Sequence, residues 1–95
     1  MVFAWDPAKA AANLKIHHID FREAATVFND PLSIAVPDAD HSTSERRFLI
    51  IGVSAYGHVL VVSYTEEAET VRIISGRRAT RRERRFYEED SQRSR

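Results

Sequence analysis

Residues 71–87 read VRIISGRRATRRERRFY, and this stretch decides the fold of the chain. It opens on an apolar segment, 71–75, with the length and the β-branched composition of a buried strand. Thr80 and Glu83 follow in the spacing of a capping box, which predicts a helix from near Thr80 to about Glu89. The stretch therefore predicts a strand that passes directly into an arginine-rich helix.

The same stretch concentrates positive charge. It holds seven arginines against one glutamate, a net charge of +6, whereas the whole chain of 95 residues is formally neutral. The rest of the chain therefore carries −6. Because the guanidinium fork binds phosphate oxygens in pairs, a segregated arginine surface on a small domain predicts a polyanionic partner. A genome rich in G and C would also favour Arg over Lys, and both explanations stay open.

Two helices are predicted ahead of the strands. Asp6-Pro7 is typical of an N-cap followed by a first helical turn, and predicts a helix to about residue 14 or 15. Asp20-Phe21-Arg22-Glu23 has the capping-box pattern and predicts a second helix, which Asp30-Pro31 ends.

Three or four antiparallel strands are predicted between the second helix and the last one. The apolar runs of strand length are 33–36, 48–53, 59–64 and 71–75. Between them, we expect a polar loop at 37–44, a hairpin turn at 55–58 and an acidic turn at 65–70. The order predicts an α+β fold: two N-terminal helices, an antiparallel sheet of three or four strands and a C-terminal helix, with the helices packed on one face of the sheet.

Length and composition narrow the class of protein. Ninety-five residues are enough for one domain, and the absence of cysteine excludes disulfides, thiolate catalysis and cysteine-based zinc sites. No segment approaches the ~20 apolar residues of a membrane span, and the N-terminus lacks the pattern of a signal peptide. We therefore expect a cytoplasmic protein with no membrane partner.

Short motifs occur in order along residues 3–89, and together they resemble the BrnT family, the toxins of bacterial type II toxin–antitoxin systems. The motifs are Phe3-x-Trp5-Asp6-x-x-Lys9, Asn13 with Lys15 and His17, Phe21-x-Glu23-Ala24-x-x-Val27-Phe28-x-Asp30-Pro31, Asp40-His41 with Glu45 and Arg47, Ile51-Gly52, Val62-x-Tyr64-Thr65, Ile73-Ile74-Ser75-x-Arg77-x-Ala79, and Glu83 with Tyr87-Glu88. The chain departs from the family pattern at Ile16, His18, His58 and Gly76, where Lys, Gly, Arg and Ala are usual.

The resemblance implies a RelE-like fold and a single toxin domain over residues 1–95. It also implies an endoribonuclease that cleaves RNA to inhibit translation and growth. The expected partner is a BrnA-like ribbon-helix-helix antitoxin, with operator DNA bound only through the antitoxin complex. The departures leave an alternative open: a degenerate toxin that binds nucleic acid or antitoxin without catalysis and acts as a co-repressor.

RNA can be cleaved without a metal or another cofactor, because its own 2′-hydroxyl attacks the neighbouring phosphate. The reaction needs a base for the 2′-hydroxyl, cations for the phosphate and an acid for the leaving oxygen. Arg77, at the end of the last strand, is predicted to stabilise the phosphate, and its guanidinium is too basic to act as the base. The candidates for base and acid are His17, His41, Glu45 and Tyr87.

Further cations are predicted to contact the RNA backbone. These are Lys9, Lys15, Arg78, Arg81 and Arg85. Arg81 and Arg85 share a helix face because they lie four residues apart. The alternative for each cation is a solvated surface charge or a contact to the antitoxin, and for Tyr87 it is simple packing against the sheet. The cluster of Asp38, Asp40 and His41 is too weak a pattern to predict a metal.

Overall fold

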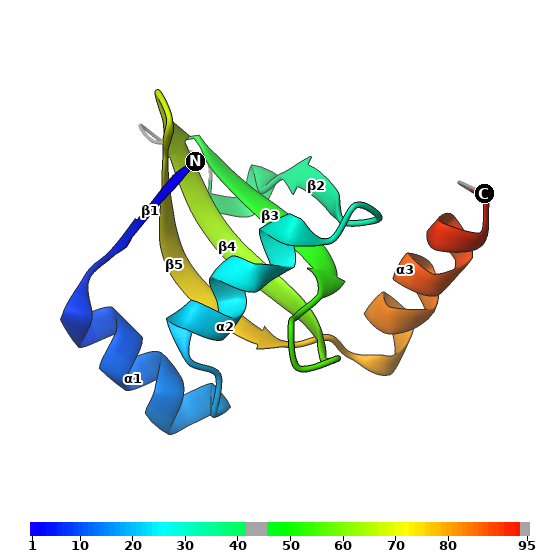
Figure 1. Ribbon diagram of the computed structural model, residues 1–95, viewed down its shortest axis with the longest axis horizontal. Helices are drawn as coiled ribbons and strands as arrows, with labels where there is room; N and C mark the ends of the chain where they lie inside the picture. Colours follow the sequence, from blue (N-terminus) through cyan, green and yellow to red (C-terminus); the bar gives the residue numbers. More distant parts are fainter. Residues whose placement is uncertain (42–45, 94–95) are drawn as a thin grey trace.

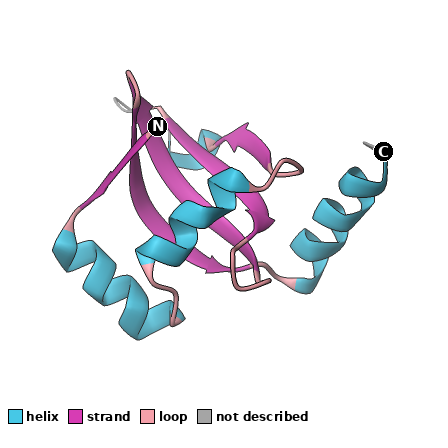
Figure 2. Cartoon of the chain, in the orientation of Figure 1, coloured by secondary structure: helices cyan, strands magenta, loops and turns pink. Residues whose placement is uncertain are grey.

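The computed structural model describes residues 1–41 and 46–93. Figures 1 and 2 show the arrangement of its helices and strands. In the labels below, η denotes a short 3-10 helix. The elements are β1 Val2–Trp5, α1 Pro7–His17, α2 Phe21–Thr26, η1 Val27–Asn29, β2 Ile34–Pro37, η2 Ala39–His41, β3 Arg47–Val53, β4 Val59–Glu67, β5 Thr70–Arg78 and α3 Arg81–Arg93.

Within the described residues, the strands form one mixed, five-stranded sheet in the order β1-β5-β4-β3-β2. The pairs from β2 to β5 are antiparallel, and β1 lies parallel to β5 at one edge. The α+β class and the C-terminal helix are confirmed, whereas the two helices expected at the N-terminus follow a strand, β1. The expected sheet of three or four antiparallel strands is wrong, because it omits β1.

The strand β1 was not predicted because its own residues carry no clear strand pattern. It has only four residues, its first residue is exposed, and its pairing partner lies far along the chain: Val2 pairs with Thr70 and Trp5 with Ile73. A parallel edge strand of this kind is held by a non-local ladder and not by a turn beside it. Its inward side chains, Phe3 and Trp5, pack against the main core.

The helices cover both faces of the sheet, and not one face as expected. On one face, α1 and α2 enclose the main core, in which Phe21, Ala24 and Ile50 are buried. On the opposite face, α3 packs through Tyr87 against a smaller cluster that contains Ile51 and Val61. Because Ile50 and Ile51 are successive residues of β3, they point to opposite faces. In Figure 1, α1 lies to the left of the sheet, α2 crosses in front of it, and α3 lies at the right, apart from both.

A buried asparagine fixes α1 to the edge of β5. The side-chain amide of Asn13 donates to the carbonyl oxygens of Ile19 at 2.9 Å and Gly76 at 2.8 Å, and its oxygen accepts from the Gly76 N–H at 3.1 Å. The amide thus takes the place of a neighbouring strand where β1 has already ended. A Cβ at Gly76 would lie 3.2 Å from the Cβ of Ala24, so the absence of a side chain allows this close packing.

Several boundaries differ from expectation. The acidic turn expected at 65–70 is mostly strand, because β4 continues to Glu67 and β5 starts at Thr70, which leaves a tight turn with Ala68 at φ 54°. The first helix extends to His17 and is closed by His18 in the left-handed conformation, with φ 60°. The hairpin turn at 55–58 is confirmed, with Gly57 at φ 82°.

Candidate functional site

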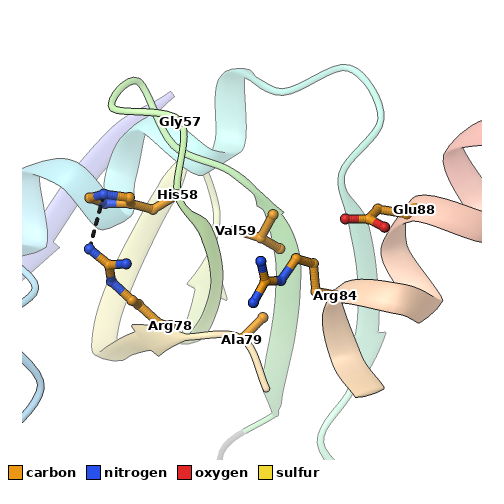
Figure 3. A pocket seen from close by; sticks show the side chains of 7 residues that line it. All are labelled: Gly57, His58, Val59, Arg78, Ala79, Arg84 and Glu88. Atoms are coloured by element: carbon orange, nitrogen blue, oxygen red, sulfur yellow. Dashed lines mark hydrogen bonds between the residues drawn. The ribbon is translucent and has the colours of Figure 1, made fainter. Parts of the chain in front are cut away.

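A pocket of about 310 Å³ opens where the β3–β4 hairpin, the end of β5 and the start of α3 meet. The side chains and backbone that line it are those of Gly57, His58, Val59, Arg78, Ala79, Arg84 and Glu88 (Figure 3). Five of these residues lie at or next to a strand end or in the hairpin turn. The other two, Arg84 and Glu88, lie one turn apart on α3.

The hairpin turn sets the position of His58. Gly57 takes the positive φ that the turn needs, its N–H donates to the carbonyl of Ser54 at 2.9 Å, and the Ser54 N–H donates to the carbonyl of His58 at 2.8 Å. His58 is therefore the last residue before β4, at the rim of the sheet. Its side chain is one-third exposed, at 33%.

Hydrogen bonds hold the His58 ring from both sides. Nδ1 lies 2.8 Å from Oε2 of Glu23, and Nε2 lies 3.0 Å from Nη2 of Arg78 (Figure 3). A carboxylate only accepts and a guanidinium only donates, so Nδ1 carries the proton and Nε2 presents its lone pair.

Glu23 reaches this ring from α2, and its side chain is only 7% exposed. Its Oε2 also accepts a hydrogen bond from the Ser54 hydroxyl at 2.7 Å. A buried carboxylate is stable only where hydrogen bonds replace its lost hydration, and here the hairpin supplies both donors. Asp20 caps the second helix as predicted, by accepting a hydrogen bond from the Arg22 N–H. The Glu23 side chain, which the capping-box pattern assigned to the same cap, instead binds residues of the hairpin.

Positive charge dominates the rim of the pocket. Arg84 also lines an adjoining hollow together with Arg81, Arg85 and Glu88. With Arg78 these side chains form one surface at the junction of β5 and α3, called here the arginine surface: Arg78, Arg81, Arg84 and Arg85. All four are exposed, so an anion in solvent can reach them.

Arg77 lies beside this surface but is committed to an ion pair. Its Nη1 and Nη2 lie 2.7 and 2.9 Å from the two carboxylate oxygens of Glu83. Glu83 also closes the predicted capping box, because it accepts from the Thr80 N–H at 2.8 Å while its own N–H donates to the Thr80 hydroxyl at 3.1 Å. The Arg77 bonds are the largest cause that lowers the Glu83 pKa from 4.5 to about 2.

The family model for the ribonuclease toxin, BrnT, of type II toxin–antitoxin system matches residues 5–83 of this chain. The chain belongs to the BrnT family. This confirms the resemblance, and the matched residues include His58, Arg77 and Arg78 but end before Arg84.

A solved BrnT structure is also similar. The 1.1 Å crystal structure of the Brucella abortus ribonuclease toxin BrnT aligns with a TM-score of 0.65, at 20% sequence identity, over 85% of this chain and 100% of that chain. At this identity the likeness establishes a shared fold. A comparison with curated proteins gave no match.

Within this BrnT-family fold, the predicted catalytic Tyr87 is not among the residues that line the pocket, and its side chain is buried between α3 and the sheet. Its hydroxyl donates to Oδ2 of Asp30 at 2.5 Å. Burial and then this bond raise the Tyr87 pKa to about 12. Burial alone would raise the pKa of Asp30, but the bonds from Tyr87 and from the N–H groups of Val53 and Leu32 lower it overall. The pair joins α3 to the loop before β2.

The basic residues predicted on the first helix and in the turn after it do not line the pocket. Lys9, Lys15 and His17 are exposed on α1, which Figure 1 places on the other side of the sheet from α3. His17 lies four residues after Asn13, and so on the side of α1 that faces the end of β5. Their roles in RNA binding and catalysis stay predictions.

The remaining two candidates come from the segment before β3. His41 ends η2, and Glu45 lies outside the described residues. Their catalytic roles stay predictions. Among the described residues, no three His, Cys, Asp or Glu side chains gather as a metal ion would require. No described helix has the length and apolar character needed to cross a membrane.

Sequence reasoning missed the central residue of the pocket. It noted His58 only as a departure from the family pattern and Glu23 only as part of a cap. The two lie 35 residues apart, and the signal that joins them is weak: a histidine directly after a glycine turn, and a glutamate on the buried side of a helix.

Proposed function

We propose that this chain is a metal-independent endoribonuclease toxin that cleaves RNA to inhibit translation and growth. The observation that carries the proposal is the pocket in which His58 lies between the arginine surface and a buried carboxylate. Membership of a ribonuclease toxin family supports the same reaction class. The proposed cytoplasmic location follows from RNA as the substrate.

The arginine surface supplies what a phosphodiester needs. Guanidinium groups pair with two phosphate oxygens at once and stabilise the charge that builds up when the 2′-hydroxyl attacks. Since the nucleophile belongs to the RNA itself, the protein has to supply only charge, position and proton transfer. The reaction therefore requires no metal ion or cofactor.

We assign the phosphate contact to Arg78 and Arg84 in place of Arg77. The fork of Arg77 already binds both oxygens of Glu83, whereas Arg78 and Arg84 are exposed and line the pocket. Arg81 and Arg85 extend the surface along α3 and would bind the next phosphates of the chain. In this assignment Arg77 sets the angle at which α3 leaves the sheet.

The proposed partner is a BrnA-like ribbon-helix-helix antitoxin, which would bind operator DNA on behalf of the complex. A type II system implies a protein antitoxin. An apolar groove between the sheet and α3 supports a bound segment, because exposed Val36 and Phe86 rim it beside the arginine surface. Co-expression with the protein encoded beside this chain tests the partner: a complex that no longer cleaves RNA is expected, and failure to associate would refute it.

The experiment that tests the function is RNA cleavage by the purified chain in EDTA. Arg78→Ala and Arg84→Ala are expected to lose cleavage, while Arg72→Ala, which removes the same charge from the far end of β5, keeps it. The non-catalytic alternative predicts salt-dependent RNA binding with no strand scission. Intact RNA in the presence of a folded wild type would overturn the proposed function, and salt-dependent binding of that RNA would support the alternative.

A further inference from the structure

We infer that His58 is the general base of the reaction and that Glu23 is its positioning residue, a deepening that rests on the proposed ribonuclease function. The inference starts from geometry. The ring is held at both nitrogens, by Glu23 on the protein side and by Arg78 on the pocket side, at 2.8 and 3.0 Å. Figure 3 shows the Nε2 edge directed at Arg78.

The tautomer suits a base. Glu23 fixes the proton on Nδ1, which leaves the lone pair of Nε2 on the side of the guanidinium. A base whose far nitrogen is bonded to a carboxylate keeps its orientation and is stabilised once it becomes an imidazolium. Glu23 is itself held by the Ser54 hydroxyl, so the whole unit is ordered before substrate arrives.

Arg78 links the base to the phosphate. In the free protein its Nη2 occupies the lone pair of Nε2. A phosphodiester is a stronger acceptor than a neutral imidazole, so bound RNA is expected to draw the guanidinium onto its own oxygens and release Nε2. The attacking 2′-hydroxyl, which lies next to that phosphate, is then within reach of the freed nitrogen.

The step balances with no further reagent. The 2′-hydroxyl proton passes to Nε2 of His58, the 2′-oxygen forms a bond to phosphorus, and the bond from phosphorus to the 5′-oxygen breaks. The 5′-oxygen takes a proton from water, and the hydroxide that remains takes the proton from the imidazolium. The products are a 2′,3′-cyclic phosphate and a 5′-hydroxyl, with His58 returned to its neutral form.

Two charged groups hydrogen-bond to the ring, Glu23 from α2 and Arg78 from β5, and Arg84 with Glu88 from α3 line the same pocket. Within the part of the chain that the structure describes, the hydrogen-bond partner of Nδ1 is Glu23. Replacement of the Glu23 carboxylate is therefore expected to destabilise the imidazolium form of His58 more than its neutral form.

The test is single-turnover RNA cleavage in EDTA across a pH series, with RNA affinity and thermal unfolding measured on the same proteins. His58→Asn is the main variant. His18→Asn is the matched control, since His18 is exposed and in a left-handed conformation that asparagine tolerates. His58→Asn is expected to lower the cleavage rate by about 10²–10⁴-fold with RNA affinity retained, and His18→Asn to cleave as wild type does.

The pH profile separates catalysis from structure. The wild-type rate is expected to rise as the imidazole loses its proton, and His58→Asn to lack that rise. Glu23→Gln keeps the shape of the side chain and is expected to move the rise to lower pH, because the imidazolium loses its anionic partner. A merely structural role for Glu23 would lower the unfolding temperature and leave the position of the rise unchanged.

The outcomes divide cleanly. If wild type cleaves RNA and His58→Asn cleaves it with the same rate and pH profile, this inference is overturned and the proposed function is unaffected. Absence of cleavage by folded wild type overturns both. If His58→Asn does not fold, the position of the rise in Glu23→Gln decides: a shift to lower pH supports the inference, and no shift overturns it.

Discussion

Arg77 and Arg78 are neighbours in the sequence, yet their side chains leave β5 on opposite sides and serve different parts of the molecule. Arg77 forms a two-bonded ion pair with Glu83 at the first turn of α3. Arg78 contacts His58 and, through it, the buried Glu23 of α2. Because side chains alternate between the two faces of a strand, these adjacent arginines have different roles. Arg77 holds α3, and Arg78 lines the pocket.

The first prediction concerns the ion pair that holds α3. Glu83→Gln is expected to lower the free energy of unfolding by about 1 to 2 kcal/mol, because it weakens both the capping box and a partly exposed ion pair. Chemical denaturation measures the change. A value indistinguishable from wild type would show that the Arg77–Glu83 pair contributes nothing to the attachment of α3.

The same carboxylate predicts an effect of pH. The folded pKa of Glu83, about 2, lies below its ordinary 4.5, so its stabilisation is present above pH 4.5 and is lost as the pH falls toward 2. The pKa values of Asp20 and Asp30 are also lowered, so wild type is compared directly with Glu83→Gln. The difference in unfolding temperature between the two should shrink on acidification through this window, and a constant difference would contradict the assignment.

The second structural link is between Tyr87 and Asp30. Tyr87→Phe is expected to cost about 1.5 to 3 kcal/mol of stability, because the partly buried Asp30 carboxylate loses a hydroxyl donor. With a pKa of about 12, the hydroxyl of Tyr87 stays protonated at neutral pH and is unsuited to act as a base. Cleavage is measured beside denaturation: a fall in rate beyond the loss of folded protein would support the catalytic role predicted from sequence.

The buried amide of Asn13 predicts a larger effect. Asn13→Ala would leave the N–H and the carbonyl of Gly76 without their partner at the edge of β5, a loss on the order of 2 to 4 kcal/mol. The helix α1 should then loosen first, which hydrogen exchange along residues 7–17 would detect as faster exchange than in α2. Uniform exchange in the two helices would contradict this account of how α1 is attached.

The arginine surface predicts how RNA binding responds to salt. Each phosphate contact to single-stranded RNA contributes about 0.7 to the slope of log affinity against log salt concentration, so Arg84→Ala should reduce that slope by about 0.7. Arg72→Ala removes one charge elsewhere on β5 and should leave the slope unchanged. Equal slopes for Arg84→Ala and wild type would remove Arg84 from the RNA-binding surface.

The sequence predicts those parts of the fold whose signals are local. Capping residues and apolar runs locate both N-terminal helices, the meander and the helix that starts after Thr80. The strand β1 and the division of the helices between the two faces depend on contacts between distant segments, so no local pattern predicts them. The family was also predictable, because the short motifs that indicated it lie mostly within residues 5–83, the segment that the family model matches.

The candidate site is less accessible to such reasoning. The arginines were found because a charge run is visible in sequence, and Arg78, Arg81 and Arg85 do lie on one surface with Arg84. The partner of each side chain was not predictable. Glu83 forms an ion pair with Arg77, and Glu23 forms a hydrogen bond with His58. Both choices depend on strand register and on which side of β5 each residue faces.

The most direct test of metal-free transesterification at the arginine surface uses two matched substrates in EDTA. One is an RNA, and the other is the same oligonucleotide with a single 2′-deoxy nucleotide at the cleaved linkage. We expect the RNA to yield cyclic phosphate and 5′-hydroxyl ends, and the substituted linkage to stay intact because it lacks the nucleophile. Cleavage of the deoxy linkage, or 5′-phosphate ends from the RNA, would contradict the proposed reaction.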